Sequence, residues 1–266
     1  MKLSGTGSFE LYRRFRYSAK EPVPLNFISA SPHFYRRTLC ALFEIHEINY
    51  TGLYLKNVLT ILDTIIRKGI HSLANLPSII SDGTGTILDR GKNFFSSTVD
   101  SFFDHTSHKL GILLENRLMQ PSGTREILIG DNTENDFFIF ALYRLLLRGV
   151  LVEENLEEYL CNLEFRGRKS MVRDVSSQLT LLAKRCTERH GPLDSVVGVW
   201  INQAIETPGE QEMIRLIGEA LPEGLKRDED VLSVISDLRA CRGAEDFEKA
   251  ALEIGLLTSG KLERKP

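Results

Sequence analysis

Residues 126–136 read EILIGDNTEND. The apolar run 127–129 is long enough for one buried strand, and Gly130 ends it and lets the backbone turn sharply. Asp131 and Asp136 follow, five residues apart, before the apolar stretch FFIFALY, which is typical of the start of a helix. A strand, a glycine turn, two carboxylates and a helix make one half of a βαβ unit, so the sequence predicts an α/β fold.

The two carboxylates of this stretch predict a ligand site. Ligands of open parallel sheets bind beyond the carboxyl ends of the strands, where Asp131 and Asp136 would lie. Two hard oxygen ligands suit Mg²⁺, which binds one or two carboxylates together with water and a substrate phosphate. The alternative is an acidic, solvated loop in which Asp131 or Asn132 only caps the helix. The spacing alone leaves both interpretations open.

Length and composition describe an ordinary globular chain. Its 266 residues suffice for one large domain or two small ones, with 42% hydrophobic and 26% charged residues. The formal net charge of −3 gives no sign of a nucleic-acid partner. The four cysteines lie far apart without a CxxC pair, which favours reduced thiols over disulfides or a zinc site.

Two further features bear on location. No apolar run approaches the roughly 18–20 residues that a membrane span needs. Residues 1–16 carry charges but lack the apolar core of a signal peptide. We therefore expect a cytoplasmic protein without a transmembrane segment, whose oligomeric state the sequence leaves undetermined.

A second strand–turn–helix unit comes earlier in the chain. Residues 25–28 predict a short strand, and a helix with an apolar side follows at residues 34–43. At the tip of the strand, Ser29 could donate a hydrogen bond to a phosphate oxygen, helped by backbone N–H groups at the helix start. For Ser31 we favour a capping role, and for His33 a place on the surface.

Two lysines could face the same site. Residues 52–56 predict another strand that ends in Lys56, although a lone lysine is usually solvated. A helix is expected to begin at His108, which puts Lys109 in its first turn. A cation there is unfavourable for the helix dipole, a cost more easily understood if Lys109 faces a negative group. A surface lysine is the alternative.

The chain changes character after Gly149. We predict an α/β domain at 1–150 and an all-helical domain or extension at 151–266, without recognisable chemistry, in which Trp200 belongs to the core. Glycine and proline separate several of the expected segments. The predicted helices are 8–16 near the N-terminus and 154–163, 171–189, 193–206, 210–220, 228–241 and 244–256 in the second half.

Taken in order, four motifs resemble those of the haloacid dehalogenase-like (HAD) phosphatases. They are FISASP at 27–32, YLK at 54–56, HKL at 108–110 and ILIGDNTEND at 127–136. The nearest branch is similar to the catalytic domain of the actin-patch phosphatidate phosphatase and its bacterial relatives. The resemblance covers about residues 5–150 and implies a doubly wound parallel sheet with helices on both faces.

The resemblance also implies roles for individual residues. Ser29 would hydrogen-bond the phosphoryl group, and Lys109 would neutralise its charge and steady an aspartyl intermediate. Asp131 and Asp136 would hold Mg²⁺. These roles agree with phosphoryl transfer, in which positioning and charge neutralisation supply most of the catalysis. The substrate would be a phosphorylated small molecule or a lipid phosphate.

The chain departs from the family pattern at its first motif. That motif, Asp-x-Asp-x-Thr, supplies the nucleophile and an acid–base carboxylate and should precede Ser29, but residues 1–28 contain no Asp. We therefore expect a HAD-like chain shortened at its N-terminus, whose sheet lacks a central strand and whose neighbouring strands expose their edges. Asp82, in the loop SDGTGT, imitates the phosphorylation loop of P-type ion pumps but stands in the wrong order.

Two functions are consistent with these residues. The first is a Mg²⁺-dependent phosphatase fold that is inactive as this chain, because its nucleophile is missing. The alternative is a non-catalytic module, derived from that fold, which binds a phosphate or a protein.

Overall fold

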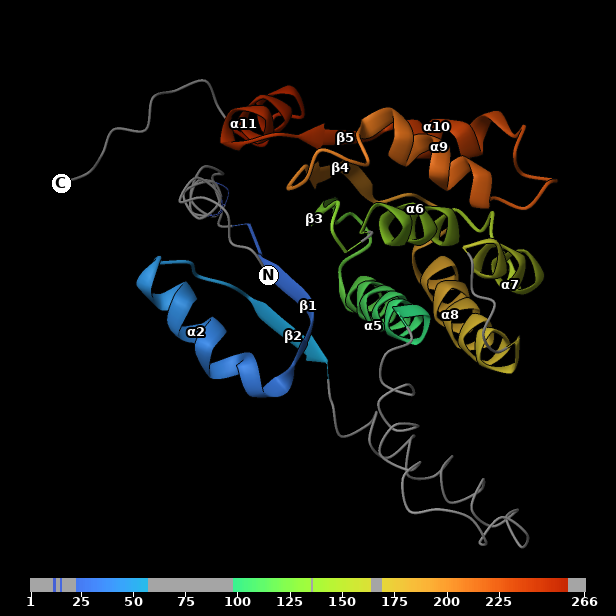
Figure 1. Cartoon of the computed structure of the whole chain (residues 1–266), viewed down its shortest axis with the longest axis horizontal. Helices are drawn as coiled ribbons and strands as arrows, with labels where there is room; N and C mark the ends of the chain where they lie inside the picture. The colour runs from blue at the N-terminus through green and yellow to red at the C-terminus, as the bar shows by residue number, and fades with distance from the viewer. Residues whose placement is uncertain are drawn as a thin grey trace, which may run out of the picture.

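The computed structural model describes Tyr12, Phe15 and residues 23–56, 98–134, 136–163 and 169–257, with side chains from residue 105 in α5 and from residue 172 in α8. The described strands form two parallel sheets, one of two strands and one of three. Figure 1 shows the smaller sheet and α2 beside a larger body of helices. The chain is thus a mixed α/β protein, as the sequence predicts.

The smaller sheet pairs β1 (Asn26–Pro32) with β2 (Gly52–Lys56), in register from Asn26 opposite Gly52 to Ser29 opposite Leu55. A 3-10 turn (His33–Tyr35) and α2 (Arg36–Ile45) connect the two strands. Phe43 packs with Leu53 and Leu55 in a small core of this unit. Both strands were expected at these places, and the structure confirms them.

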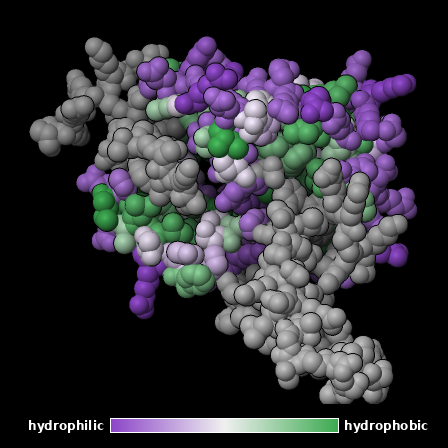
Figure 2. All heavy atoms as spheres, in the orientation of Figure 1, coloured by the Kyte–Doolittle hydropathy of each residue, from purple (hydrophilic) through white to green (hydrophobic). Residues whose placement is uncertain are grey.

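The predicted apolar side of the α2 segment is only partly correct. Phe43 is buried, whereas Phe34 is 71% exposed. Figure 2 shows hydrophobic residues gathered on the surface over this part of the molecule. Phe34 lies in the 3-10 turn before α2, so it does not share the helical period that joins Leu39, Leu42 and Phe43.

The larger sheet has the order β3 (Glu126–Asp131), β4 (Val196–Asn202) and β5 (Leu238–Cys241). Successive side chains of a strand point to opposite faces, and β3 follows this rule: Leu128 packs into the main core, while Ile127 and Ile129 pack on the cluster around Trp200. Helices therefore cover both faces of this sheet.

The main core is built around α6 (Asp136–Leu147), in which every residue is buried. A helix that is apolar on all sides belongs in the interior, and α6 contacts β3, β4, α5, α8, α9 and α10. The other helices are α5 (Thr98–Met119), α7 (Glu153–Asn162), α8 (Lys169–His190), α9 (Glu210–Ala220), α10 (Glu229–Ser236) and α11 (Ala244–Glu253). α11 packs on β5, and its Phe247 belongs to the Trp200 cluster.

The prediction of an all-helical region at 151–266 is wrong. The segment 193–206 contains β4, and the segment 228–241 contains α10 followed by β5. β4 pairs with β3, so one sheet crosses the boundary that was predicted at residue 150. The signal was present, because Val196, Val199 and Ile201 are β-branched residues, which favour strands. The placement of Trp200 in the core is confirmed, since it is 3% exposed.

Several predicted features lie partly or wholly outside the described residues. Asp82 and the segment around it are outside them, as is most of the expected N-terminal helix, of which Tyr12 and Phe15 are described and helical. The helices predicted at 154–163, 171–189, 210–220 and 244–256 are confirmed as α7, α8, α9 and α11. In the part of the chain that the structure covers, every helix is too short or too polar to cross a membrane.

Candidate functional site

The candidate site lies where β3 meets α6. Gly130 belongs to β3 rather than to a turn, which corrects the sequence interpretation. Its role is close approach: a Cβ at this position would come within 2.5 Å of the Asp136 Cβ and 2.8 Å of Phe140 Cε2. Only glycine lets the first turn of α6 press against the strand, and this contact brings Asp136 beside Asp131.

Replacement of Gly130 by Ala is expected to lower the free energy of unfolding by about 1–3 kcal/mol, because the methyl group overpacks a buried contact. Urea denaturation measures the loss. The matched control is Gly111→Ala in α5, where a Cβ would meet nothing within 4 Å. In an open helix interior that change should stabilise by about 0.5–1 kcal/mol. Equal effects of the two substitutions would contradict the proposed close contact.

Asp131 organises the turn between β3 and α6. Its Oδ1 accepts hydrogen bonds from Thr133 N at 2.8 Å, Thr133 Oγ1 at 2.5 Å and Glu134 N at 3.0 Å. These partners precede α6, so Asp131 holds the loop and is not seen to cap the helix, which was the alternative that the sequence left open. Oδ2 of Asp131 takes no part in these bonds, so holding the turn and binding a ligand are compatible for this side chain.

Lys109 lies next to both carboxylates of this loop. Its Nζ donates to Asp136 Oδ1 at 2.5 Å and to Glu134 Oε2 at 2.8 Å. The Lys109 and Asp136 side chains are only 7% and 9% exposed, whereas Glu134 is 40% exposed. The backbone N–H of Asp131 also donates to Asp136 Oδ2, at 3.3 Å. Three of the four predicted site residues, Lys109, Asp131 and Asp136, thus come together.

Lys109 does not occupy a helix start, so the dipole argument for it is wrong. α5 begins at Thr98, and Lys109 is in its interior. The ten residues before His108 are rich in Ser, Thr and Asp, which are weak helix formers, and so the sequence suggested too late a start. The expectation that Lys109 faces negative groups is nevertheless confirmed by its two ion pairs.

Burial sets the protonation behaviour of the pair. Burial raises the pKa of Asp136 to about 6, although the nearby Lys109 opposes the rise. Burial lowers the pKa of Lys109, but the negative charges of Asp136 and Glu134 outweigh it and hold that pKa above its ordinary value. At neutral pH the pair is therefore mainly ionic.

Tyr12 reaches the same site from the N-terminal segment. Burial raises the pKa of its phenol, and the negative charge of Asp131 raises it further. Its ring also packs edge-on against Phe27 of β1, with 5.4 Å between ring centroids. Tyr12 therefore connects the smaller sheet to the end of β3.

Ser29, the fourth predicted residue, lies in the middle of β1 in the smaller sheet, opposite Leu55 of β2, and not at the strand end where the sequence analysis placed it. Its Oγ accepts a hydrogen bond from Ser31 N at 3.2 Å. Ser31 itself belongs to β1, and the caps of the 3-10 turn and of α2 are Pro32 and Tyr35, so the capping role expected for Ser31 is wrong. His33 is exposed, as expected.

The sequence analysis named Asn132 only as a possible helix cap and missed its role in the structure. It is 2% exposed, and its Nδ2 donates to Ile205 O at 2.9 Å and Pro208 O at 3.2 Å. Its Oδ1 accepts from Ala204 N at 3.0 Å and Ile205 N at 3.3 Å. The side chain thus fixes the loop after β4 beside Asp131. Its partners lie more than seventy residues away in the chain, so no local pattern could reveal it.

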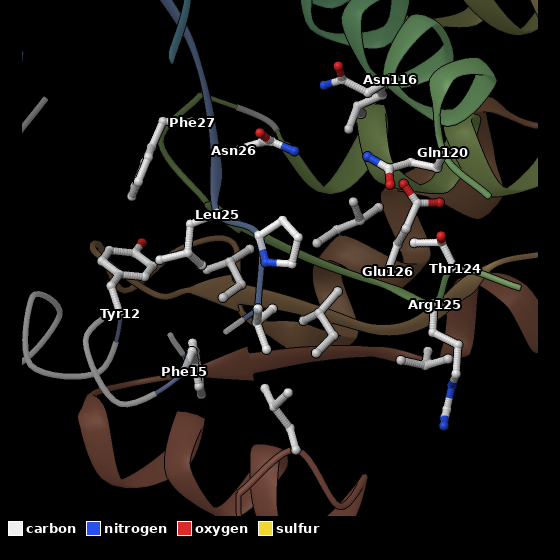
Figure 3. Close-up of a pocket in the computed structure, with 18 of the residues that line it drawn as sticks. Tyr12, Phe15, Leu25, Asn26, Phe27, Asn116, Gln120, Thr124, Arg125 and Glu126 are labelled. Atoms are coloured by element: carbon white, nitrogen blue, oxygen red, sulfur yellow. The ribbon is translucent and has the colours of Figure 1, made fainter. Parts of the chain in front are cut away.

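A cavity of about 500 Å³ lies apart from this cluster, between the two sheets (Figure 3). Residues 23–28 and 124–129 form its longest walls, and Tyr12, Phe15 and parts of α5 and of the chain after α11 complete it. Lys109, Ser29, Asp131 and Asp136 are not among the described residues that line it.

A metal ion would find incomplete ligation here. Asp131 and Asp136 are hard oxygen ligands of the kind that Mg²⁺ prefers. Among the residues covered by the structure, however, no group of three or more His, Cys, Asp or Glu side chains is arranged to hold a metal. The donor set therefore fits an ion that takes its remaining ligands from water and a phosphate. Comparisons with models of protein families, with curated proteins and with solved structures give no match for this chain.

Proposed function

We propose that the chain is a HAD-like domain that binds a phosphate group and Mg²⁺ at the end of β3 and does not turn over phosphomonoesters by itself. The observation that carries the proposal is the buried Lys109 ammonium, which contacts Asp136 beside Asp131 at the carboxyl end of a parallel strand. This is the position at which parallel sheets bind ligands.

The chemistry of the site is compatible with a phosphorylated ligand. When bound, Mg²⁺ would neutralise phosphate charge, with Asp131 and Asp136 as its protein ligands. Lys109 would add a second positive charge. Ser29 of β1 and the N–H groups that follow β1 would be further donors, supplied from the smaller sheet.

Glu134 gives a reason to expect an anion at this position. Its carboxylate contacts Lys109 at 2.8 Å, yet the side chain is 40% exposed and can move into water. A half-exposed ion pair contributes at most about 1 kcal/mol. We infer that a phosphate group would displace the Glu134 carboxylate from Lys109 and leave the buried Lys109–Asp136 pair in place.

The proposed lack of turnover rests on the sequence. Residues 1–28 contain no Asp, so the carboxylate that the resemblance places before Ser29 is missing from this chain. Without a nucleophile the remaining groups can bind and orient a phosphate but cannot form a covalent intermediate. The alternative is a non-catalytic module that binds a protein instead of a phosphate. In that case the site would have no affinity for phosphate or for Mg²⁺.

Thermal unfolding with and without inorganic phosphate and MgCl₂ tests the proposal. Binding to the folded chain at one hundred times the dissociation constant should add about 2.7 kcal/mol of stability and raise the melting temperature. Asp131→Asn keeps an oxygen for the turn but removes the negative charge. It should abolish the part of the rise in melting temperature that depends on magnesium. Para-nitrophenyl phosphate should not be hydrolysed. No shift with either ion would overturn the binding site, and hydrolysis that Asp131→Asn abolishes would overturn the prediction of inactivity.

Glu134→Gln is expected to bind phosphate more tightly than the unchanged chain, by up to about fivefold, because the amide competes less well for Lys109. Titration with inorganic phosphate by calorimetry measures the change. Glu115→Gln is the control, since it changes the net charge equally at an exposed position of α5, the helix that carries Lys109. Unchanged or weaker binding by Glu134→Gln would show that phosphate does not replace this carboxylate.

A further inference from the structure

The cavity between the two sheets follows the edges of two strands. Residues 24–28, which lead into β1 and form its first part, all line the cavity. So do Arg125, the residue before β3, and residues 126–129 of β3 itself. Successive side chains of a strand point to opposite faces, so a cavity against one face would contact every second residue. Contact with consecutive residues means that the cavity follows the edge, where backbone N–H and C=O groups point.

These two edges have no strand beside them in the part of the chain that the structure describes. β1 pairs only with β2, and β3 pairs only with β4, as far as those residues extend. An open edge is a template for another strand, because its backbone donors and acceptors need partners. Here two such edges border one cavity.

Side chains also cover the cavity on its other two sides. Leu113 and Asn116 of α5 line one of them, together with Gln120, which directly follows the helix. Phe15 and the residues after α11, among them Ile254 and Leu256, line another. Figure 3 shows Asn116 and Gln120 on the α5 side and Phe15 on the opposite side. A strand in this space would be buried on both faces, and such strands consist of nearly continuous Val, Ile and Leu.

We propose that the cavity is a groove that binds an extended apolar segment of another polypeptide, which enters as a strand and joins β1 to β3. The segment would contribute about five or six residues, the usual strand length, and both of its edges would form backbone hydrogen bonds. The proposal does not depend on the phosphate site, because none of the four predicted site residues lines the groove.

The shape of the groove decides between occupants. A strand that lies between two edges needs both of its own edges free. Each of the five described strands is already paired with at least one neighbour, so a second folded copy of this chain offers no such strand from its described residues. The occupant is therefore a segment that is not part of a sheet before it binds.

A short peptide can test the groove directly. The probe is the acetylated and amidated peptide KVIVIVK, whose lysines keep it soluble, and the control is KVIPIVK, whose proline removes a backbone donor. Trp200 is the single tryptophan of the chain, and its ring centroid lies 5.9 Å from that of the groove residue Phe15. Its fluorescence therefore reports binding. We expect a dissociation constant below about 100 μM for KVIVIVK, and at least about tenfold weaker binding of KVIPIVK.

Hydrogen exchange identifies the place of binding. Within residues 26–28 and 126–129, the alternate amides that point to the groove should exchange at least about tenfold more slowly with KVIVIVK than without it. Asn116→Phe, which fills the α5 side of the groove, should weaken binding at least about tenfold. Glu115→Phe, on the neighbouring exposed position of α5, should leave it unchanged.

Three results would overturn the proposal. The first is equal affinity of the chain for KVIVIVK and KVIPIVK, or equal affinity of Asn116→Phe and Glu115→Phe for KVIVIVK. The second is slow exchange of both edges without peptide, which would mean that this chain covers the groove itself. The third is a dimer in sedimentation that Asn116→Phe dissociates, which would make a second copy the occupant.

Discussion

Replacing Lys109 with Met should lower the free energy of unfolding by about 3–5 kcal/mol at pH 8, because it leaves the buried carboxylate of Asp136 without its counter-ion. Met keeps most of the length and apolar volume of the lysine stem, so a cavity contributes little to the loss. Glu134 cannot compensate, since it carries the same charge as Asp136.

The loss should be much smaller at pH 5, and the direction follows from the pKa of Asp136. Burial raises that pKa to about 6 in the folded chain, above its ordinary value of 3.8. A carboxyl group with a raised pKa holds more protons when folded than when unfolded, so its contribution to stability is complete below the unfolded value and is lost as the pH rises through the folded one. Without Lys109 the pKa of Asp136 rises further. At pH 5 the Asp136 carboxyl group is then neutral, so its burial lowers the free energy of unfolding only slightly.

Urea denaturation of the variant and the unchanged chain at pH 5 and pH 8 measures this difference. Lys226→Met is the matched control, because Lys226 pairs with Glu223 at a surface where the Glu223 side chain is 85% exposed. That change should cost less than about 1 kcal/mol at either pH. A loss for Lys109→Met that is the same at both pH values would mean that Asp136 is not the group left unpaired.

The site could be predicted from the sequence where its geometry is local. The strand Ile127–Ile129, the acidic turn and the apolar helix that follows are consecutive, and each has its own period or turn signal. Asp131 and Asp136 are therefore positioned by their immediate neighbours. Lys109 was named from the family resemblance and from an expected helix start that the structure corrects, so its place beside the carboxylates did not follow from local geometry.

The parts that could not be predicted depend on distant contacts. β4 is buried on both faces, so Val196, Val199 and Ile201 do not alternate with polar residues, and periodicity alone does not separate such a strand from a helix. Ser29 lies inside a strand of a different sheet from Asp131, and the rule that strand ends converge applies within one sheet. Sequence order gives no information on which sheet a strand joins.

Arg144 is the second position at which one substitution should have a large effect. It is 3% exposed in the otherwise apolar α6, and its guanidinium connects three parts of the core. Nε donates to Asp194 Oδ2 at 2.8 Å, one terminal nitrogen donates to Val234 O at 2.8 Å, and the other donates to Asp237 Oδ2 at 3.0 Å. These bonds hold α6 to the segment before β4 and to the end of α10, and so they fix the sheet that carries the candidate site.

Arg144→Met should therefore destabilise the chain by about 3–5 kcal/mol, because the Asp194 carboxylate, only 6% exposed, loses its main partner. Among the residues that the structure describes, Arg148 is the other cation paired with Asp194, at 3.4 Å, and its side chain is 30% exposed. Urea denaturation measures the loss, and Arg215→Met, which removes two exposed ion pairs on α9, should cost less than about 1 kcal/mol.

A double-mutant cycle shows whether the charge of Asp194 is the cause. If Arg144→Met acts by leaving that carboxylate unpaired, adding Asp194→Asn should restore part of the lost stability, since a buried amide needs no counter-ion. The bond to the Val234 carbonyl is lost in both variants, so recovery should be incomplete by about 1–3 kcal/mol. Strictly additive losses would instead mean that Arg144 stabilises the core through its packing and its other hydrogen bonds, and that the charges of Arg144 and Asp194 do not depend on each other.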